Sequence, residues 1–304
     1  MKLPQLHVGF GTQCGSATIF PVWADSPETQ GLVTGSETQL VVQELPTPEV
    51  GRLTVTNMGA KAALLTEGQL LESGQQHRIA EQTVLIGASE TAVINVLCVE
   101  KGRWSGSAEH RSSGRRAPLQ VHAGLHRTGT DRQSDVWHRV HRYEGSRTTS
   151  ATGSLLDHLD QPRPQDIVLP NIVDGQRGVI IGFDGRVLSL ELFGSHKLFR
   201  QHYAELMESM VPDLLLFNTP AGRGAPAIVR AQSARDFIVA IASNGFVFRD
   251  HAEHRSGNRT IPARRFEGNH PQLPLKGVSI EGTDGADPQI AHLIAWNGKH
   301  SMLA

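Results

Sequence analysis

The 304-residue sequence predicts an α+β fold that is rich in β-structure, with an antiparallel sandwich-like or barrel-like core and several helices in the second half. Aromatic residues make up only 5% of the chain, whereas 31 glycines and 16 prolines are spread along it. This composition is typical of many short strands joined by turns and not of a helical bundle. The second half mixes strands and helices without regular alternation, which favours the α+β class.

The first hundred residues contain the clearest strand signals. Short runs of β-branched residues lie between Gly, Pro and Asn residues, as expected of strands joined by turns. Residues 91–100 are apolar on both alternating faces, as in a central strand, and Cys98 and Glu100 share one of these faces. The predicted strands cover residues 17–20, 40–42, 53–56, 83–86 and 91–100.

The next segment, residues 101–147, is basic. It holds ten Lys and Arg against four Asp and Glu, together with five of the 15 histidines. Residues 105–130 have almost no apolar periodicity and predict a long loop. A helix follows, which we expect to be capped by Ser134 and to end at Gly145. Its apolar face consists of Val136, Trp137, Val140 and Tyr143.

The second half begins with a hairpin signal, in which Asp184-Gly185 joins two apolar runs and favours a type I′ turn. Ser195 is then expected to cap a helix with an apolar stripe that stops before Pro212. The remaining predictions are helices at 154–159 and 234–242, and strands at 179–183, 187–193, near Phe246, 262–266, 278–281 and 290–296.

Charge and motifs exclude several classes of protein. With 29 Lys+Arg against 30 Asp+Glu, the chain lacks the excess positive charge of a protein whose whole surface binds nucleic acid. The P-loop, Rossmann and nucleophile-elbow motifs are absent. No stretch approaches 18 consecutive apolar residues, so we expect no membrane partner. The distant Cys14 and Cys98 fit a reducing cytoplasm better than a secreted disulfide framework.

Two polar stretches carry the candidate chemistry. Residues 66–78 offer two carboxylates, several amides, an imidazole and a guanidinium between apolar strands, where a site or simply a solvated loop would fit. In residues 98–104, Glu100 can act as a base, ligate a cation or anchor a ribose hydroxyl, and Trp104 offers a stacking face. The structural alternatives are an ion pair of Glu100 with Arg103 and a core role for Cys98.

A divalent metal remains open as a cofactor, and the sequence predicts no firm ligand set. Lone histidine pairs are more often solvated surface residues, and the first of the two pairs here falls in the predicted loop. The candidate ligands are His77 with Glu67, Glu72 or Glu100, and the helix-spaced pairs His122/His126 and His138/His141.

The two stretches together resemble a bacterial domain family named for its association with ADP-ribosylglycohydrolase and rhodanese-phosphatase proteins. The resemblance rests on residues 67–70, 74–78 and 83–86 and on the phrase Cys-Val-Glu-Lys-Gly-Arg-Trp that ends at Trp104. The helix phrase from Gln133 to Trp137 and the strand entry at 176–178 are also similar. The resemblance spans residues 9–210, about two thirds of the chain.

This resemblance implies a role around NAD and ADP-ribose in metabolism or signalling. The chain departs from the family pattern at His77, where members have Asn, and at Gln75, where the absent Lys removes a phosphate contact. Carried over by position, the recurrent polar residues are Glu67, Gln76, Arg78, Cys98, Glu100, Arg103 and Trp104, supported by Gln133 and Trp137.

The leading hypothesis is an enzyme that acts on an ADP-ribose or NAD-derived nucleotide sugar by hydrolytic or transfer chemistry. A non-catalytic nucleotide sensor and a nucleic-acid contact through residues 101–147 are the alternatives, although few stacking aromatics argue against the second. The candidate catalytic residues are Glu67, Glu100 and Cys98, and the candidate ligand-binding residues are Gln76, His77, Arg78, Arg103, Trp104 and Gln133.

The expected partners are a small nucleotide-type ligand and, through the resemblance, ADP-ribosylglycohydrolase-type proteins. We expect residues 1–210 to form the family-like β-rich core domain with inserted helices. Residues 211–304 are expected to form a C-terminal α+β extension that packs on the same core.

Overall fold

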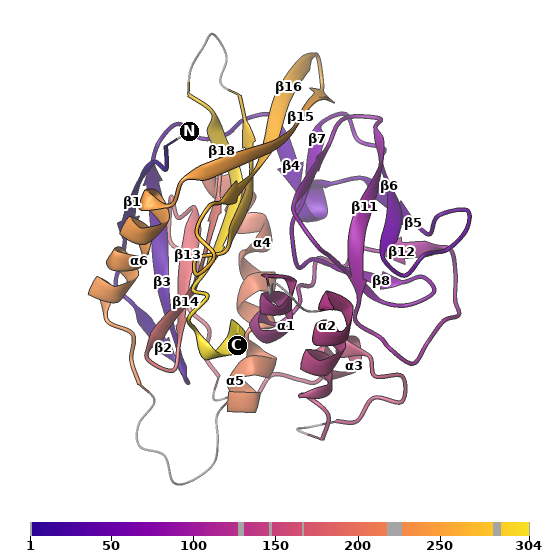
Figure 1. Ribbon diagram of the computed structural model, residues 1–304, viewed down its shortest axis with the longest axis horizontal. Helices are drawn as coiled ribbons and strands as arrows, with labels where there is room; N and C mark the ends of the chain where they lie inside the picture. The colour runs from indigo at the N-terminus through magenta and orange to yellow at the C-terminus, as the bar shows by residue number, and fades with distance from the viewer. Residues whose placement is uncertain are drawn as a thin grey trace.

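A nine-stranded sheet and a six-stranded closed barrel lie side by side in the computed structural model of the protein (Figure 1). The structure describes residues 2–126, 131–145, 148–165, 167–217, 227–281 and 287–303, and each structural statement below concerns these residues.

The large sheet is antiparallel and draws its strands from both ends of the chain. Strands that follow residue 211 therefore hydrogen-bond with strands that precede it, and the division into a core and an extension at this point stays a prediction. In spatial order the sheet contains β1 (Gln5–Val8), β3 (Ala17–Asp25), β13 (Gly178–Phe183), β14 (Arg186–Phe193), β18 (Gln289–Trp296), β17 (Leu275–Ile280), β16 (Arg259–Gly268) and β15 (Phe246–Ser256), and β2 (Thr12–Cys14) pairs with β3.

Helices cover both faces of this sheet because its central strands are apolar on both sides. On β13, Val179 and Ile181 belong to the core that includes α4 (His196–Ser209), whereas Ile180 belongs to the core that includes α6 (Ala231–Ser243). Figure 1 shows α4 on the barrel side of the sheet and α6 on its outer face. Helix α5 (Val211–Phe217) follows α4 and packs against it.

Six strands between residues 40 and 111 form the barrel, and a three-stranded sheet lies beside it. The barrel encloses its own apolar core, which includes Val42, Val55 and Val96. In closed order its strands are β11 (Thr91–Cys98), β6 (Arg52–Asn57), β5 (Leu40–Gln43), β12 (Glu109–Arg111), β8 (Leu70–Ser73) and β9 (Arg78–Ala80). The smaller sheet contains β10 (Val84–Ile86), β7 (Ala62–Leu65) and β4 (Leu32–Thr34), of which β4 and β7 run parallel. The predicted β-rich α+β class with a barrel-like core is confirmed.

Short helices close one end of the barrel (Figure 1). Their apolar side chains pack on Leu70, Ile79 and Leu97 of the barrel strands. They are α1 (Leu119–Ala123), the 3-10 turn η2 (Gly124–His126), α2 (Arg132–His141) and α3 (Leu155–Leu159), and the other 3-10 turns are η1 (Gly35–Glu37) and η4 (Ser301–Leu303). None of the helices in the described ranges is both long and apolar enough to cross a lipid bilayer.

Several boundaries differ from the sequence predictions. The segment 105–130 is not one loop, because β12, α1 and η2 lie in it, while its residues 127–130 fall outside the described part. Polar residues interrupt the apolar pattern of these helical turns, although Gln120, His122 and His126 are themselves buried. In sequence they look polar and break the apolar period on which the prediction of a helix depends.

The start of α2 and the end of β11 differ from the positions that the sequence predicts. Asp131, and not Ser134, caps α2, because the Asp131 carboxylate accepts the backbone N–H of Gln133. Strand β11 ends at Cys98, before Glu100, which makes only an isolated bridge to Ser154. The Ser195 cap is confirmed, and so are the hairpin and the positive φ of both Asp184 and Gly185 that a type I′ turn requires.

Candidate functional site

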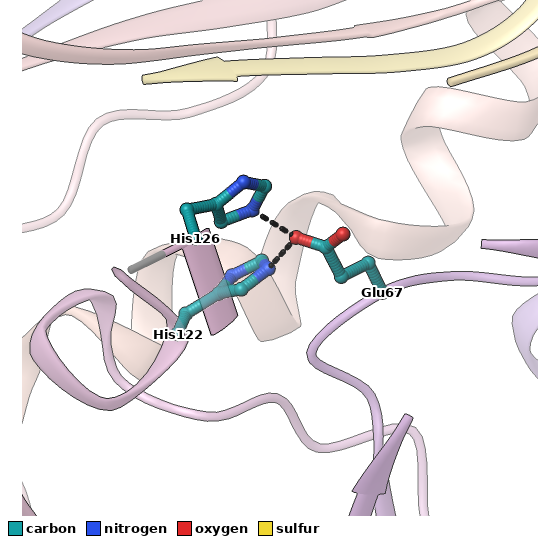
Figure 2. A group of neighbouring side chains, drawn as sticks. All are labelled: Glu67, His122 and His126. Carbon is teal, nitrogen blue, oxygen red and sulfur yellow. Dashed lines mark hydrogen bonds and ion pairs between the residues drawn. The ribbon is translucent and has the colours of Figure 1, made fainter. Parts of the chain in front are cut away.

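Glu67, His122 and His126 bring three metal-ligating groups together between the barrel and the large sheet (Figure 2). Oε1 of Glu67 accepts hydrogen bonds from Nε2 of His122 at 2.9 Å and from Nε2 of His126 at 2.5 Å. The ligating atoms all lie within 4.8 Å of one another, and the three residues are only 1%, 2% and 6% exposed. No second group of three such residues occurs in the described ranges.

Local structure explains how these three side chains meet. Glu67 lies between β7 and β8, where its backbone N–H donates to Oγ1 of Thr83 at 3.0 Å. The next residue, Gly68, has a φ of +77°, and a Cβ there would lie 2.7 Å from the ring of His122. Only glycine allows this close approach without strain. His122 and His126 are four residues apart along α1 and η2, so they project from the same side.

Burial and neighbouring groups favour an ionised Glu67 carboxylate beside a neutral His126 imidazole. Burial acts to raise the pKa of Glu67, but the charges of His126 and Lys276 and hydrogen bonds from both histidines outweigh it, so that its pKa lies well below the usual value. Burial lowers the pKa of His126 from 6.5 to about 4, against the attraction of Glu67. At neutral pH these are the protonation states in which Glu and His bind a metal ion.

A second buried network holds Glu67 from the large sheet. Oε1 of Glu191 accepts from Nη1 of Arg116 at 2.6 Å and from Nε2 of His292 at 2.9 Å. Nδ1 of His292 lies 2.9 Å from Oγ1 of Thr83, the same oxygen that accepts the backbone N–H of Glu67. Oγ1 of Thr83 thus connects the His292 ring to the main chain of Glu67. This chain of bonds fixes the main chain of Glu67.

Two atoms of the cluster lack a hydrogen-bond partner in the part of the chain that the structure describes. They are Oε2 of Glu67 and Nδ1 of His126. Buried polar atoms are almost always paired, so two such atoms in one three-residue cluster call for an explanation. Two histidines and one glutamate form a ligand set of catalytic zinc, and tetrahedral geometry with bonds near 2.0 Å needs edges of about 3.3 Å. Small side-chain shifts from the observed separations would provide them.

Glu100 and Arg103 form a different cluster. Oε2 of Glu100 accepts from Nη2 of Arg103 at 2.6 Å and from the backbone N–H of His77 at 3.1 Å, and its Oε1 accepts from Oγ1 of Thr152 at 2.8 Å. Arg103 also donates to the backbone carbonyls of Gly74 and Ser105. Both charged groups are therefore engaged by partners within the chain.

The neighbouring predicted residues also hold the backbone. Oε1 of Gln133 accepts the backbone N–H of Cys98, and Nε2 of Gln133 donates to the Cys98 carbonyl, each at 2.8 Å. Gln76 donates to the Glu100 carbonyl at 3.0 Å. Burial raises the pKa of the Cys98 thiol, which keeps it protonated at neutral pH. Trp137 lies on α2, with Nζ of Lys101 at 5.3 Å from its ring centroid.

Arg78 is fully buried inside the barrel and lies under Trp104. Its Nε donates to the carbonyl of Val50 at 3.0 Å, and its Cζ lies 5.6 Å from the centroid of the Trp104 ring. Nη1 and Nη2 of Arg78 have no hydrogen-bond partner among the described residues. Trp104 itself is half exposed.

The structure thus separates the residues that the sequence hypothesis combined. The backbone N–H of Gly68, beside Glu67, bonds to Ala80 at one end of β9, whereas Gln76 and His77 reach Glu100 beyond the other end. His77 lies 3.5 Å from Glu100 and does not join Glu67.

The sequence does not predict the pairing of Glu67 with His122 and His126. The solvated surface expected for this histidine pair is wrong, because both residues are buried, whereas His138 and His141 are exposed. The spacing of four residues was a valid signal, but the loop predicted around it was not. The apolar residues Leu119, Val121, Ala123 and Leu125 are all buried, but they recur at every second position and give no helical period in the sequence.

One family model matches a range of the chain that includes both the Glu67 cluster and the Glu100 cluster. The family model described as the ARG and Rhodanese-Phosphatase-superfamily-associated Protein domain matches residues 5–285, well beyond the 9–210 suggested by the motifs. Comparisons with curated proteins and with solved structures gave no match. Since the matched range includes nearly the whole chain, the protein belongs to the family of ARG and Rhodanese-Phosphatase-superfamily-associated Protein domains.

Proposed function

We propose that this protein is a metal-dependent enzyme that hydrolyses a nucleotide sugar of the ADP-ribose class at the Glu67 centre. The observation that carries the proposal is the meeting of one buried, ionised Glu and two buried His side chains, with all ligating atoms within 4.8 Å. The association of the family with ADP-ribosylglycohydrolase proteins supports this substrate class.

Three protein ligands leave one coordination position for water, which is the arrangement of catalytic zinc sites. A divalent ion held there would lower the pKa of that water to about 7 and supply a nucleophile at neutral pH. Each histidine would ligate through one ring nitrogen, and Oε2 of Glu67 and Nδ1 of His126, which have no hydrogen-bond partner among the described residues, are available for the ion. The chain from Glu191 through His292 and Thr83 would keep Glu67 in place while the ligands exchange their mutual hydrogen bonds for bonds to the ion.

The Glu100 and Arg78 clusters have supporting roles in this proposal. Glu100 and Arg103 already satisfy each other, so we assign them to holding the 73–105 loops together. Ligand sensing without turnover is the second candidate function, and the two unpaired nitrogens of buried Arg78 favour it. In that case the ligand would displace Trp104 and present an anionic group to the guanidinium.

Metal analysis and a turnover assay test the proposal together. The protein is purified, its zinc, manganese and iron contents are measured, and it is assayed against ADP-ribose, NAD and unrelated nucleotides. We expect about one divalent ion per chain and release of product only from ADP-ribose-type substrates. Glu67→Gln should lose turnover, whereas His138→Ala, which changes an exposed histidine, should retain it.

Turnover that survives both Glu67→Gln and exhaustive chelation would overturn the proposal. Tight ADP-ribose binding without turnover, abolished by Arg78→Met and unaffected by Glu67→Gln, would favour the sensor instead.

A further inference from the structure

A cavity of about 270 Å³ lies beside the Glu67 centre. Two of its lining residues contact Glu67 directly. Thr83 binds the backbone N–H of Glu67, and Nζ of Lys276 lies 4.0 Å from its Oε2, the carboxylate oxygen without a hydrogen-bond partner in the described residues. The cavity therefore adjoins the proposed metal ligand, with Thr83 and Lys276 between the two.

Three cations line this cavity on one face of the β15–β17 sheet. Arg249 and Arg265 stand directly opposite each other on β15 and β16, and Lys276 on β17 stands opposite Glu267. Like charges at directly opposed positions of an antiparallel pair are destabilising. An anion bound between Arg249 and Arg265 would remove this cost.

Each of these arginines forms an ion pair with a carboxylate at the surface of the protein, and such exposed pairs are weak. Arg265 pairs with Asp250, and Nε of Arg249 lies 3.7 Å from Oε2 of Glu267. All four side chains are more than a third exposed, and ion pairs at such positions contribute little to stability. A phosphate group could therefore replace them as the partner of both guanidinium groups, which bind phosphate oxygens in a bidentate manner.

The backbone is also unusual at this place. The β15–β16 register shifts between Arg249 and His251, and the bulged Asp250 has a φ of +40°. A non-glycine residue in this region is strained, and bulges occur often beside active sites, where they redirect side chains. Here the bulge places Asp250 at the cavity next to Arg249.

We propose that this cavity is a phosphate-binding subsite, in which Arg249, Arg265 and Lys276 hold a diphosphate group of the substrate beside the Glu67 centre. The proposal rests on the proposed function for the reaction and names the part of the substrate that enters. A cavity of about 270 Å³ is smaller than the roughly 300–1,000 Å³ of pockets that enclose a whole ligand. The nucleoside end of the substrate would therefore extend away from the centre.

Titration with inorganic pyrophosphate tests the subsite apart from the reaction. The probe is added to the metal-free, chelator-treated protein, so that binding through a metal ion does not contribute. The variant Arg249→Gln/Arg265→Gln should weaken pyrophosphate binding at least tenfold, and Lys276→Met should also weaken it. The control is Arg255→Gln/Arg259→Gln, which removes two exposed arginines from the far end of the same hairpin. It should bind within twofold of the wild type.

Equal pyrophosphate binding by the wild type and the Arg249→Gln/Arg265→Gln variant would overturn the subsite, as would absence of binding to the wild type. Metal content separates this inference from the proposed function. If pyrophosphate binding depends on the arginines while no variant or wild-type protein holds a metal, the subsite stands and the metal-dependent reaction fails. If the metal and turnover are present but pyrophosphate binding does not depend on the arginines, the metal-dependent reaction stands and the subsite fails.

Discussion

Oε1 of Glu67 lies 2.9 Å from Nε2 of His122, although 55 residues separate them in the sequence. The contact joins the loop between β7 of the small sheet and β8 of the barrel to the short helix α1 (Figure 2). Trp296 of β18 closes the arrangement, with its ring centroid 5.2 Å from that of His122 and 5.4 Å from that of His126. The barrel, the helical layer and the large sheet thus all contribute to one centre.

The first prediction concerns the two histidine ligands. His122→Ala/His126→Ala should reduce the bound metal from about one ion per chain to less than a tenth of that, because one carboxylate alone does not hold a transition metal. His138→Ala/His141→Ala is the matched control, since these exposed histidines have the same kind of helical spacing. Metal content by plasma mass spectrometry checks it, and equal loss in both double variants would contradict it.

The second prediction separates the two carboxylates that sequence analysis proposed as catalytic. Glu67→Gln should lower kcat at least a hundredfold, because it weakens a metal ligand. Glu100→Gln should keep kcat within about threefold and instead lower the free energy of unfolding by about 1–3 kcal/mol, since its bonds to Arg103 and His77 are weakened. Steady-state kinetics and urea unfolding of both variants decide this, and the opposite ranking of the two kcat values would assign the chemistry to Glu100.

The third prediction concerns Gln133, which satisfies both backbone groups of Cys98. Gln133→Ala leaves this N–H and this carbonyl without their partner and should lower the free energy of unfolding by about 1–3 kcal/mol. Gln232→Ala, at an exposed position of α6, should change it by no more than about 0.5 kcal/mol. If the Gln133 variant unfolds at the same urea concentration as the wild type, the amide contributes nothing to stability.

The fourth prediction is a pH dependence of stability due to Asp213. Burial raises its pKa from 3.8 to about 7, against hydrogen bonds from Tyr143 and the backbone of Gln120. The folded state therefore binds more protons than the unfolded state between about pH 4 and 7, and the unfolding free energy should fall as pH rises through this window. Asp213→Asn should flatten this slope, by at most roughly 4 kcal/mol over the window. Urea unfolding at several pH values measures it, and identical slopes in both proteins would refute the assignment.

The fold could be predicted from the sequence where local signals are strong. The Asp184-Gly185 turn, the Ser195 cap and the strand beginning at Thr91 each depend on nearby residues, and the structure confirms them. Strand pairing across the chain could not be predicted in this way. That β14 pairs with β18 depends on the packing of two faces of a sheet, which no single segment records.

The candidate site shows the same limit. Glu67 is a candidate from the sequence because it lies in a polar stretch between strands, and that signal is local. Its partners lie on a helix whose apolar pattern is interrupted by the very histidines that the site uses. A buried polar residue is indistinguishable from a surface residue in sequence, so the pattern of residues 105–130 predicts a long loop. Only the folded chain shows that Glu67 and the two histidines share one buried space.

The most direct test of the central claim is a zinc titration of chelator-treated wild-type protein and of Glu67→Gln, followed by calorimetry. The account predicts one high-affinity site per wild-type chain and at least a tenfold weaker site in the variant, because the ionised carboxylate oxygen is replaced by a neutral amide. Absence of a stoichiometric site in the wild-type protein, or equal affinity in the variant, would contradict it.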